Sequence, residues 1–169
     1  MKRPLTFSLA LSLLLVGAAW VLAHPHITKS VSAKLPSGAD ASVTYTTVPA
    51  NEDYAKKAAA GSFLTPRRPK LKLMAEVKAG NITLAAGDYT IGAIKNGEKD
   101  FIMALFPGET PRTGAPDMSK VIKLDSQFDT AHGKAEHLNV DIMPGSGKFE
   151  GKVVLTLHFG TLFLEGALS

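Results

Sequence analysis

The side chains of this sequence with the greatest capacity for metal chemistry are its five histidines: His24, His26, His132, His137 and His158. A neutral imidazole is a common ligand of copper. If the chain is cleaved after Ala23, His24 carries a free α-amine as well as its imidazole. A second imidazole would then complete a T-shaped site with three nitrogen ligands. One hypothesis is therefore a copper-binding protein that uses His24 and a second histidine, for which we name His26 and His137.

Other interpretations of the same histidines involve no metal. Pro25 has no amide hydrogen, which excludes a square-planar peptide site at the new terminus. Chain ends often make no fixed contacts, so the alternative is that His24 and His26 are simply exposed. His137 shares one face of a predicted strand with Asp141. There it would either begin an acid–base site or lie on the solvent side of the strand.

No catalytic sequence motif is present. The Gly-x-Ser-x-Gly nucleophile elbow, the P-loop and the Gly-x-Gly-x-x-Gly phosphate-binding pattern do not occur. A hydrolase would therefore need a site assembled from distant loops, which spacing along the chain does not reveal. The long predicted loop at 107–118 is rich in proline and glycine, and it is where we most expect a functional insertion.

The beginning of the chain has the pattern of an export signal. Two basic residues open it, an almost unbroken apolar run follows at 7–16, and small residues lead up to Ala23. We therefore expect residues 1–23 to be a signal peptide, residues 24–169 to form a single domain, and the processed protein to be periplasmic or secreted. The alternative is that residues 5–23 remain uncleaved as a membrane anchor.

Composition narrows the choice of partners. The chain has no cysteine, which excludes disulfides, thiolate metal sites and a cysteine nucleophile.

Removing the signal takes two of the 19 basic residues and none of the 15 acidic ones, which leaves a net charge of +2. The densest basic cluster, between Arg67 and Lys72, is short for a nucleic-acid-binding surface. We expect no nucleic acid as partner. We also expect no membrane span after signal cleavage, because no second apolar run reaches about 18 residues.

Hydrophobic and polar side chains alternate along most of residues 24–169, which is the pattern of half-buried strands. We predict strands at 27–34, 41–48, 70–77, 81–84, 88–94, 101–106, 120–124, 136–143, 152–159 and 161–167. Asn51 is suited to begin the one convincing helix, at 51–60, and Gly61 to end it. Asn96-Gly97 is a strong hairpin signal.

About nine short strands with frequent turn signals, and a single helix, are typical of an all-β protein. The predicted fold is an antiparallel β-sandwich, or a flattened barrel, with one short helix. The segment at 65–69 should be a rigid connector, because its two prolines fix their own backbone and donate no hydrogen bonds.

Residues 71–108 resemble a family of bacterial secreted proteins called domain of unknown function 2911; their sequence is LKLMAEVKAGNITLAAGDYTIGAIKNGEKDFIMALFPG. The family signature is represented by Leu84-Ala85-Ala86-Gly87-Asp88-Tyr89-Thr90, and the likeness extends from about residue 29 to residue 167. The Trp-Arg-x-Gly-Ala-Asn stretch common in that family is not present, and residues 66–69 occupy roughly its place. The resemblance implies a secreted, β-rich domain in which Gly87 permits a tight turn and Tyr89 fills the core. It implies no activity.

These observations favour an exported binding or structural module of the cell envelope, without enzymatic activity, whose envelope or extracellular ligand is unknown. The alternatives are the copper-binding protein and a hydrolase with a site assembled from loops. No cofactor is expected apart from copper in the first alternative.

Overall fold

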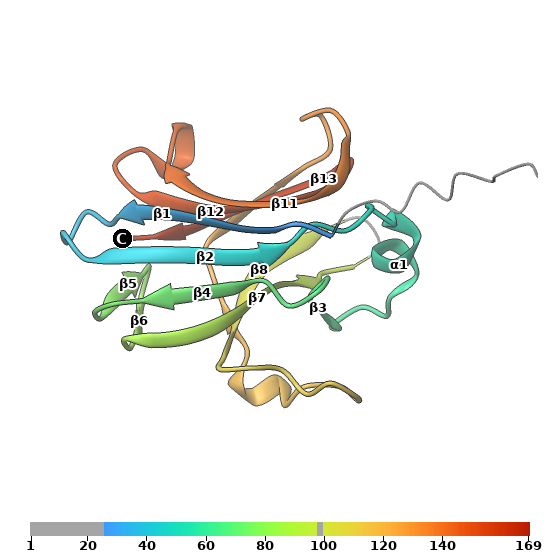
Figure 1. Ribbon diagram of the computed structural model, residues 1–169, viewed down its shortest axis with the longest axis horizontal. Coiled ribbons are helices and arrows are strands. Elements are labelled where there is room, and N and C mark those ends of the chain that lie inside the picture. The colour runs from blue at the N-terminus through green and yellow to red at the C-terminus, as the bar shows by residue number, and fades with distance from the viewer. Residues whose placement is uncertain (1–25, 98–99) are drawn as a thin grey trace, which may run out of the picture.

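Two antiparallel sheets pack face to face in the computed structural model of the chain (Figure 1). The structure describes residues 26–97 and 100–169. The sheets remain separate layers and do not close into a barrel, so the predicted all-β sandwich is confirmed and the flattened barrel is not adopted.

Seven strands form the larger sheet, in the order β1-β2-β4-β7-β8-β9, with β3 paired to β7. These strands are β1 (Thr28–Lys34), β2 (Asp40–Thr46), β3 (Phe63–Leu64), β4 (Lys70–Leu73), β7 (Gly87–Lys95), β8 (Phe101–Pro107) and β9 (Ile122–Lys123). The predicted hairpin at Asn96-Gly97 joins β7 to β8. Its loop spans 96–100 and is closed by a hydrogen bond from the Asn96 N–H to the Asp100 carbonyl (2.8 Å).

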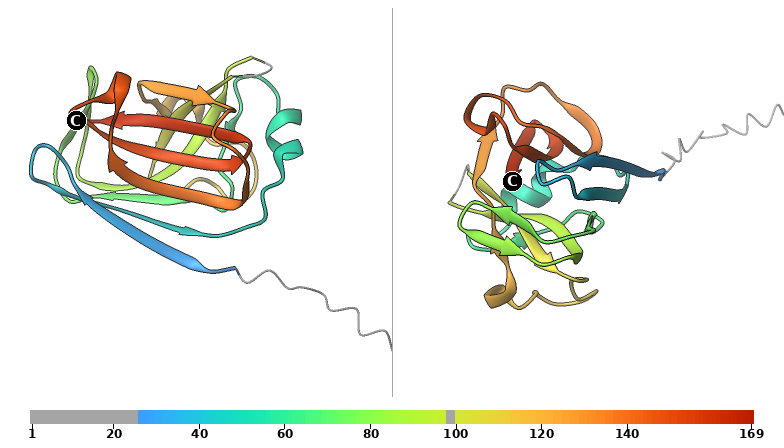
Figure 2. Two further views of the ribbon diagram at one scale, coloured as in Figure 1. Left: turned by 90° about the horizontal axis from the view of Figure 1, so that it is seen from above. Right: turned by 90° about the vertical axis from the view of Figure 1, so that its left-hand side faces the viewer.

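The second sheet has four strands in the order β10-β13-β12-β11, and Figure 2 shows it from two further sides. The strands are β10 (Ser126–Asp129), β11 (Ala135–Pro144), β12 (Val153–Gly160) and β13 (Leu162–Leu168). A two-stranded ribbon, β5 (Val77–Ala79) and β6 (Ile82–Leu84), lies at one end of the sandwich. Two short 3-10 turns are η1 (Met118–Lys120) and η2 (Gly147–Phe149).

The described residues form thirteen strands, more than the nine or so expected. One reason is that the strand predicted at 70–77 breaks after Leu73. There its neighbours end on both sides, because Leu73 pairs with Ala41 near the start of β2 and with Gly87 at the start of β7. Beyond that point the backbone finds a new partner, and β5 pairs with β6.

The helix α1 (Glu52–Lys57) is shorter than the predicted 51–60. It ends early because the Lys95 amine donates hydrogen bonds to the carbonyls of Lys56 and Ala58 (2.9 Å to Ala58), which replaces further helical bonding there. Gly61 has the expected left-handed backbone (φ 83°), but it follows the helix at some distance. No helix in the described part of the chain is long and apolar enough to cross a bilayer.

The core lies between the two sheets and draws on both of them. Val43 and Leu105 of the larger sheet, and Val140 and Leu155 of the smaller one, have no exposed surface. Along β4 the exposed and buried residues alternate strictly, as the period-two pattern predicts. Along β7 almost every residue is buried, because chain also covers the outer face of that strand, away from the smaller sheet. That outer covering builds the site described next.

Candidate anion-binding groove

Two segments without long regular structure cover the outer face of β7 and β8: the connector at 62–69 and the loop at 108–121. The loop lies on the side of the larger sheet away from the four-stranded sheet (Figure 1). A small apolar cluster fixes both segments, and it consists of Phe63, Ile94, Ala104 and Phe106 with Val121 packed against it. Phe106, at the end of β8 next to this loop, is therefore buried.

The connector approaches β7 very closely, and this requires a glycine. A Cβ atom on Gly92 would lie 2.4 Å from the Leu64 carbonyl oxygen and 2.6 Å from the Phe63 ring. The missing side chain lets β3 pair with β7 at the Phe63–Ile94 register. The Thr65 hydroxyl then donates to the Ile91 carbonyl (2.8 Å), which fixes the beginning of the basic segment, residues 66–70.

The basic segment has a strained backbone. Arg67 and Arg68 both have left-handed conformations (φ 56° and 49°), and they are the only residues other than glycine with positive φ in the described ranges. The Arg68 N–H donates to the Thr65 carbonyl (3.3 Å), which closes a turn in which glycine would normally follow the proline. Such a conformation costs on the order of 1–3 kcal/mol per residue. Two prolines flank the pair and hold this shape.

The loop is held in place by Thr90, a buried residue of β7. Its hydroxyl donates to the Gly108 carbonyl (2.7 Å), and the Gly108 N–H donates to the Asp88 carbonyl (2.8 Å). These bonds direct the chain that follows toward the connector. As a result Glu109 and Arg112 face the two arginines across a groove of about 450 Å³.

The groove has an excess of positive charge. It is lined by Thr65, Arg67, Arg68, Lys70, Thr90, Glu109 and Arg112. Lys70 pairs with Glu109, and this hydrogen bond, helped by the charges of Lys70, Arg112 and Arg68, holds the pKa of Glu109 below its usual range. The three arginines form no ion pair among the described residues, so their charges are left for a ligand. Planar guanidinium groups bind the oxygens of phosphate and carboxylate in pairs.

A second hollow, of about 200 Å³, continues the groove and shares Thr65 and Arg68 with it. Its other walls are Tyr54, Phe63, Thr110, Pro111, Gly114 and Pro116. Thr110 is 6% exposed, and its hydroxyl is the one buried side-chain polar group in the described ranges without a hydrogen-bond partner.

The predicted copper ligands do not form a described site. His24 lies outside the described residues. His26 Nδ1 is 3.1 Å from the Thr47 carbonyl oxygen, and His137 forms a bridge with Pro49. The structure therefore brings His26 and His137, which are distant in sequence, to the same short segment of chain. Within 26–97 and 100–169, no three histidine or acidic side chains converge as a metal site.

His132 and His158 lie together on the outer face of the four-stranded sheet. His132 stacks on Phe163 with ring centroids 3.9 Å apart, and His158 meets the same ring edge-on at 5.3 Å. His132 also pairs with Asp129 (3.0 Å), and His158 Nε2 is 3.4 Å from the Gly133 carbonyl oxygen. These rings contact carbonyl and carboxylate oxygens and not the hydroxyl of a nucleophile, so the contacts are those of packing. Asn139, on the predicted polar face of β11, accepts a hydrogen bond from Tyr45 (2.7 Å).

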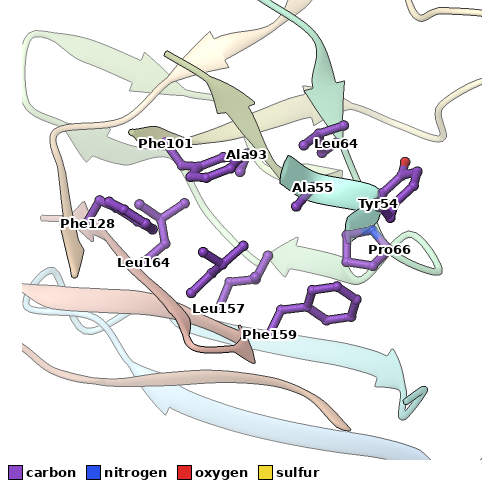
Figure 3. A pocket seen from close by; sticks show the side chains of 11 residues that line it. Tyr54, Ala55, Leu64, Pro66, Ala93, Phe101, Phe128, Leu157, Phe159 and Leu164 are labelled. Carbon is purple, nitrogen blue, oxygen red and sulfur yellow. The ribbon is translucent and has the colours of Figure 1, made fainter. Parts of the chain in front are cut away.

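A cavity between the sheets near α1 is lined only by apolar surface (Figure 3). Its volume is about 30 Å³, room for one or two water molecules, so it is a packing defect and not a ligand site. An open hollow of about 570 Å³ lies beside it and shares Phe101, Phe128 and Leu162. The two lysines of that hollow are already engaged: Lys95 with the end of α1, and Lys56 with Glu52.

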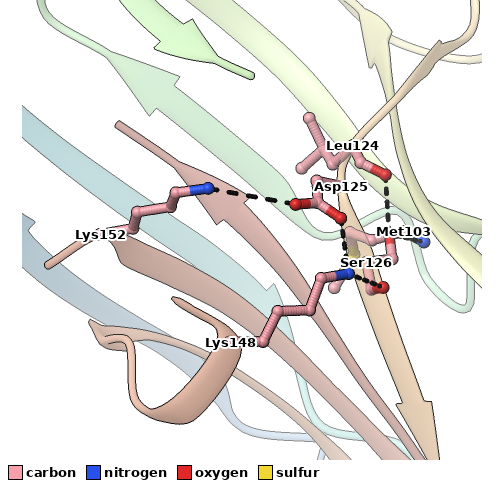
Figure 4. A network of polar contacts seen from close by, with 6 residues as sticks. All are labelled: Met103, Leu124, Asp125, Ser126, Lys148 and Lys152. Carbon is pink, nitrogen blue, oxygen red and sulfur yellow. Dashed lines mark hydrogen bonds and ion pairs between the residues drawn. The ribbon is translucent and has the colours of Figure 1, made fainter. Parts of the chain in front are cut away.

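The most connected ion pairs of the smaller sheet are structural. Asp125 pairs with Lys148 at 2.7 Å and with Lys152 at 4.0 Å, and Lys148 also donates to the Ser126 carbonyl (Figure 4). These contacts fasten η2 over the beginning of β10. The positive charges near this end of the sheet are therefore already paired.

Comparison with known proteins found no match for the chain. No protein-family model, no curated protein and no solved structure is significantly similar to it.

Sequence reasoning found both halves of the groove but did not join them. The cluster between Arg67 and Lys72 is short for a nucleic-acid-binding surface, and the loop at 107–118 is where the sequence predicts a functional insertion. No local pattern singles out Arg112 within that loop. A usable signal was present, because the chain has four arginines: Arg3 lies outside the described residues, and the other three line the groove.

Proposed function

We propose that this protein is an exported, non-enzymatic binding module of the cell envelope that takes an anionic ligand in the groove of Arg67, Arg68 and Arg112. The signal pattern of residues 1–23 supports export to the periplasm or beyond. The resemblance to domain of unknown function 2911 belongs to the same proposal, since it implies a secreted β-rich domain.

One observation carries the proposal: every arginine after the predicted signal lines one groove, and none of the three has an ion pair among the described residues. The remaining basic residues of that part of the chain are all lysines. Lysine would serve solubility equally well, whereas arginine is favoured where oxyanions are bound through two parallel hydrogen bonds. Like charges held together on strained backbone oppose folding, which is the behaviour expected of a binding site.

Titration with inorganic phosphate and with sulfate tests the proposal. The processed chain, purified from cells, is titrated in a calorimeter at low ionic strength, because salt screens exposed charges. We expect saturable binding that weakens at least tenfold in the Arg68→Gln/Arg112→Gln double variant. Lys72→Gln is the matched control, since Lys72 is exposed on β4 and does not line the groove. Equal affinity in the double variant and the parent protein contradicts the proposal.

Export has its own test. Intact mass and N-terminal sequencing of protein recovered from the periplasm or the medium should show that the chain begins at His24. Full-length chain confined to the cytosol is the opposite result.

Copper binding is a second candidate function, favoured by the placement of His26 and His137 at the same segment, Thr47 to Pro49. With His24 as the first residue, three imidazoles would lie near one end of the strand pair β1–β2. One equivalent of Cu(II) should then give a nitrogen-ligand spectrum by spin resonance. This spectrum should change in His24→Ala and in His137→Gln, and a spectrum unaffected by both variants removes this candidate.

A further inference from the structure

The anion groove adjoins a second hollow. Arg68 and Thr65 line both of them, so the path from one to the other runs along these two residues. The chemistry changes along this path. One end is cationic, and the other presents the rings of Tyr54, Phe63, Pro111 and Pro116.

The walls of the hollow are suited to a flat, weakly polar group. Phe63 is fixed by the apolar cluster on β7 and β8, whereas the Tyr54 side chain is on the exposed face of α1 and its residue is 52% exposed. Aromatic and proline rings give a ring-shaped ligand a large contact area at little cost in side-chain entropy. An exposed tyrosine at the rim of a cationic site is therefore placed for stacking.

Thr110 provides an independent indication of a ligand. It lines the hollow, is more than nine-tenths buried, and its hydroxyl has no hydrogen-bond partner among the described residues. Buried hydroxyls nearly always have a partner, so an unpartnered one in the wall of this hollow favours a ligand there.

We propose that the ligand is an organic phosphate monoester, with its phosphoryl group on the arginines and its ring in the hollow beside Tyr54. This inference rests on the proposed anion-binding function and adds the second half of the ligand. A phosphoryl group fits the site better than a carboxylate does. Its oxygens carry up to two negative charges, which match three arginines that have no ion pair within the described part of the chain.

Four small probes separate the two halves: inorganic phosphate, phenyl phosphate, benzoate and phenol. The processed chain is titrated with each under the same conditions. We expect phenyl phosphate to bind at least tenfold more tightly than inorganic phosphate and at least fivefold more tightly than benzoate, and phenol to show no saturable binding.

Three variants assign the contributions. Tyr54→Ala should reduce the affinity for phenyl phosphate at least fivefold and leave that for inorganic phosphate unchanged, whereas Tyr54→Phe should keep both. Arg68→Gln should weaken both phosphates. Because Tyr54 is exposed, its loss should not unfold the protein, and thermal melting of each variant checks this.

The outcomes distinguish this inference from the function on which it rests. If inorganic phosphate binds through the arginines but phenyl phosphate binds no more tightly, the groove is an anion site and the ring subsite is wrong. If benzoate binds as tightly as phenyl phosphate, the phosphate assignment is wrong. If no anion binds, both this inference and the proposed function fail.

Discussion

Two charged regions, one at Glu52 of α1 and one at Arg67 and Arg68 of the connector that follows, differ in whether their charges are paired. At the first, Glu52 accepts hydrogen bonds from the Thr161 N–H (2.7 Å) and hydroxyl (3.0 Å) and pairs with Lys56 (2.5 Å). At the second, Arg67 and Arg68 have a strained backbone and form no ion pair with any residue of 26–97 and 100–169. A region with every charge satisfied holds the fold together. Unpaired charge on strained backbone does not stabilise the fold, and it is the basis of the proposal that a ligand binds at this second region.

The Glu52 region is the one whose loss should cost the most stability. Hydrogen bonds from Lys56, then from the Thr161 backbone, lower the pKa of Glu52 to about 2 from 4.5. Its side chain is only 16% exposed, although that of Lys56 is 56% exposed and its contribution is screened by water. After that discount, Glu52→Gln should reduce the free energy of unfolding by about 2 kcal/mol, as measured by urea denaturation.

Asp53→Asn is the matched control for this first prediction. Asp53 pairs with Lys57 at the same helical spacing, but both side chains are at least 70% exposed. The change should cost less than about 0.5 kcal/mol. Equal effects of the two substitutions would show that the contact between α1 and the β12–β13 turn is unimportant.

The same carboxylate should give the protein an acid-sensitive stability. A pKa that is lower in the folded state means that Glu52 stabilises the fold when ionised, above its unfolded pKa near 4.5. This contribution should be lost as the pH falls from about 5 toward the folded pKa of about 2. The free energy of unfolding, measured across this pH range, should fall less steeply in Glu52→Gln than in the parent protein. A parallel decline in both proteins would mean that other carboxylates dominate.

Two buried threonines, Thr90 of the groove and Thr110 of the hollow beside it, allow the same comparison. Thr90 donates a hydrogen bond to Gly108, whereas the Thr110 hydroxyl has no partner among the described residues. Thr90→Val should destabilise the protein by about 1–2 kcal/mol because it leaves a carbonyl unpaired. Thr110→Val should be neutral or slightly stabilising without ligand. If Thr110→Val lowered the free energy of unfolding as much as Thr90→Val does, the Thr110 hydroxyl would stabilise the fold. That result would remove an argument for a ligand.

The smallest effect should come from the strained turn. Alanine at position 67 keeps the left-handed strain and glycine relieves it, while both remove the guanidinium. Arg67→Gly should therefore be more stable than Arg67→Ala by about 1 kcal/mol. At Lys72, in the extended strand β4, the order of stability should reverse, and Lys72→Gly should be less stable than Lys72→Ala. The same order at both positions would argue against strain at Arg67.

Local patterns of the sequence predicted the fold well where each strand has one buried face. The alternation at 136–143 corresponds to β11, whose Leu138, Val140 and Ile142 are buried. Residues 88–94 and 101–106 correspond to the β7–β8 hairpin, which was predictable from its Asn96-Gly97 turn although both faces of β7 are covered. Residues 126–129 were not predicted as a strand. They pair with β13 in the structure, and so short a strand depends on its neighbour more than on its own pattern.

The candidate site was harder to predict because its parts are far apart in sequence. Nothing local links Arg68 to Arg112, which lie 44 positions apart and meet only because the connector and the loop both pack on β7 and β8. The left-handed backbone at Arg67 and Arg68 is equally invisible in the sequence, since two prolines predict a rigid connector but not its shape.

By itself, the order of residues determined the sandwich class, the lack of cysteine chemistry and the short helix, because alternation and composition act over a few neighbouring positions. Tertiary structure alone decided that three arginines share one groove, that Glu52 contacts Thr161, and that no described residue hydrogen-bonds to the Thr110 hydroxyl. Such contacts are set by which strands become neighbours and how closely the covering segments approach them. That is a property of the packed chain, and no short stretch of it contains the information.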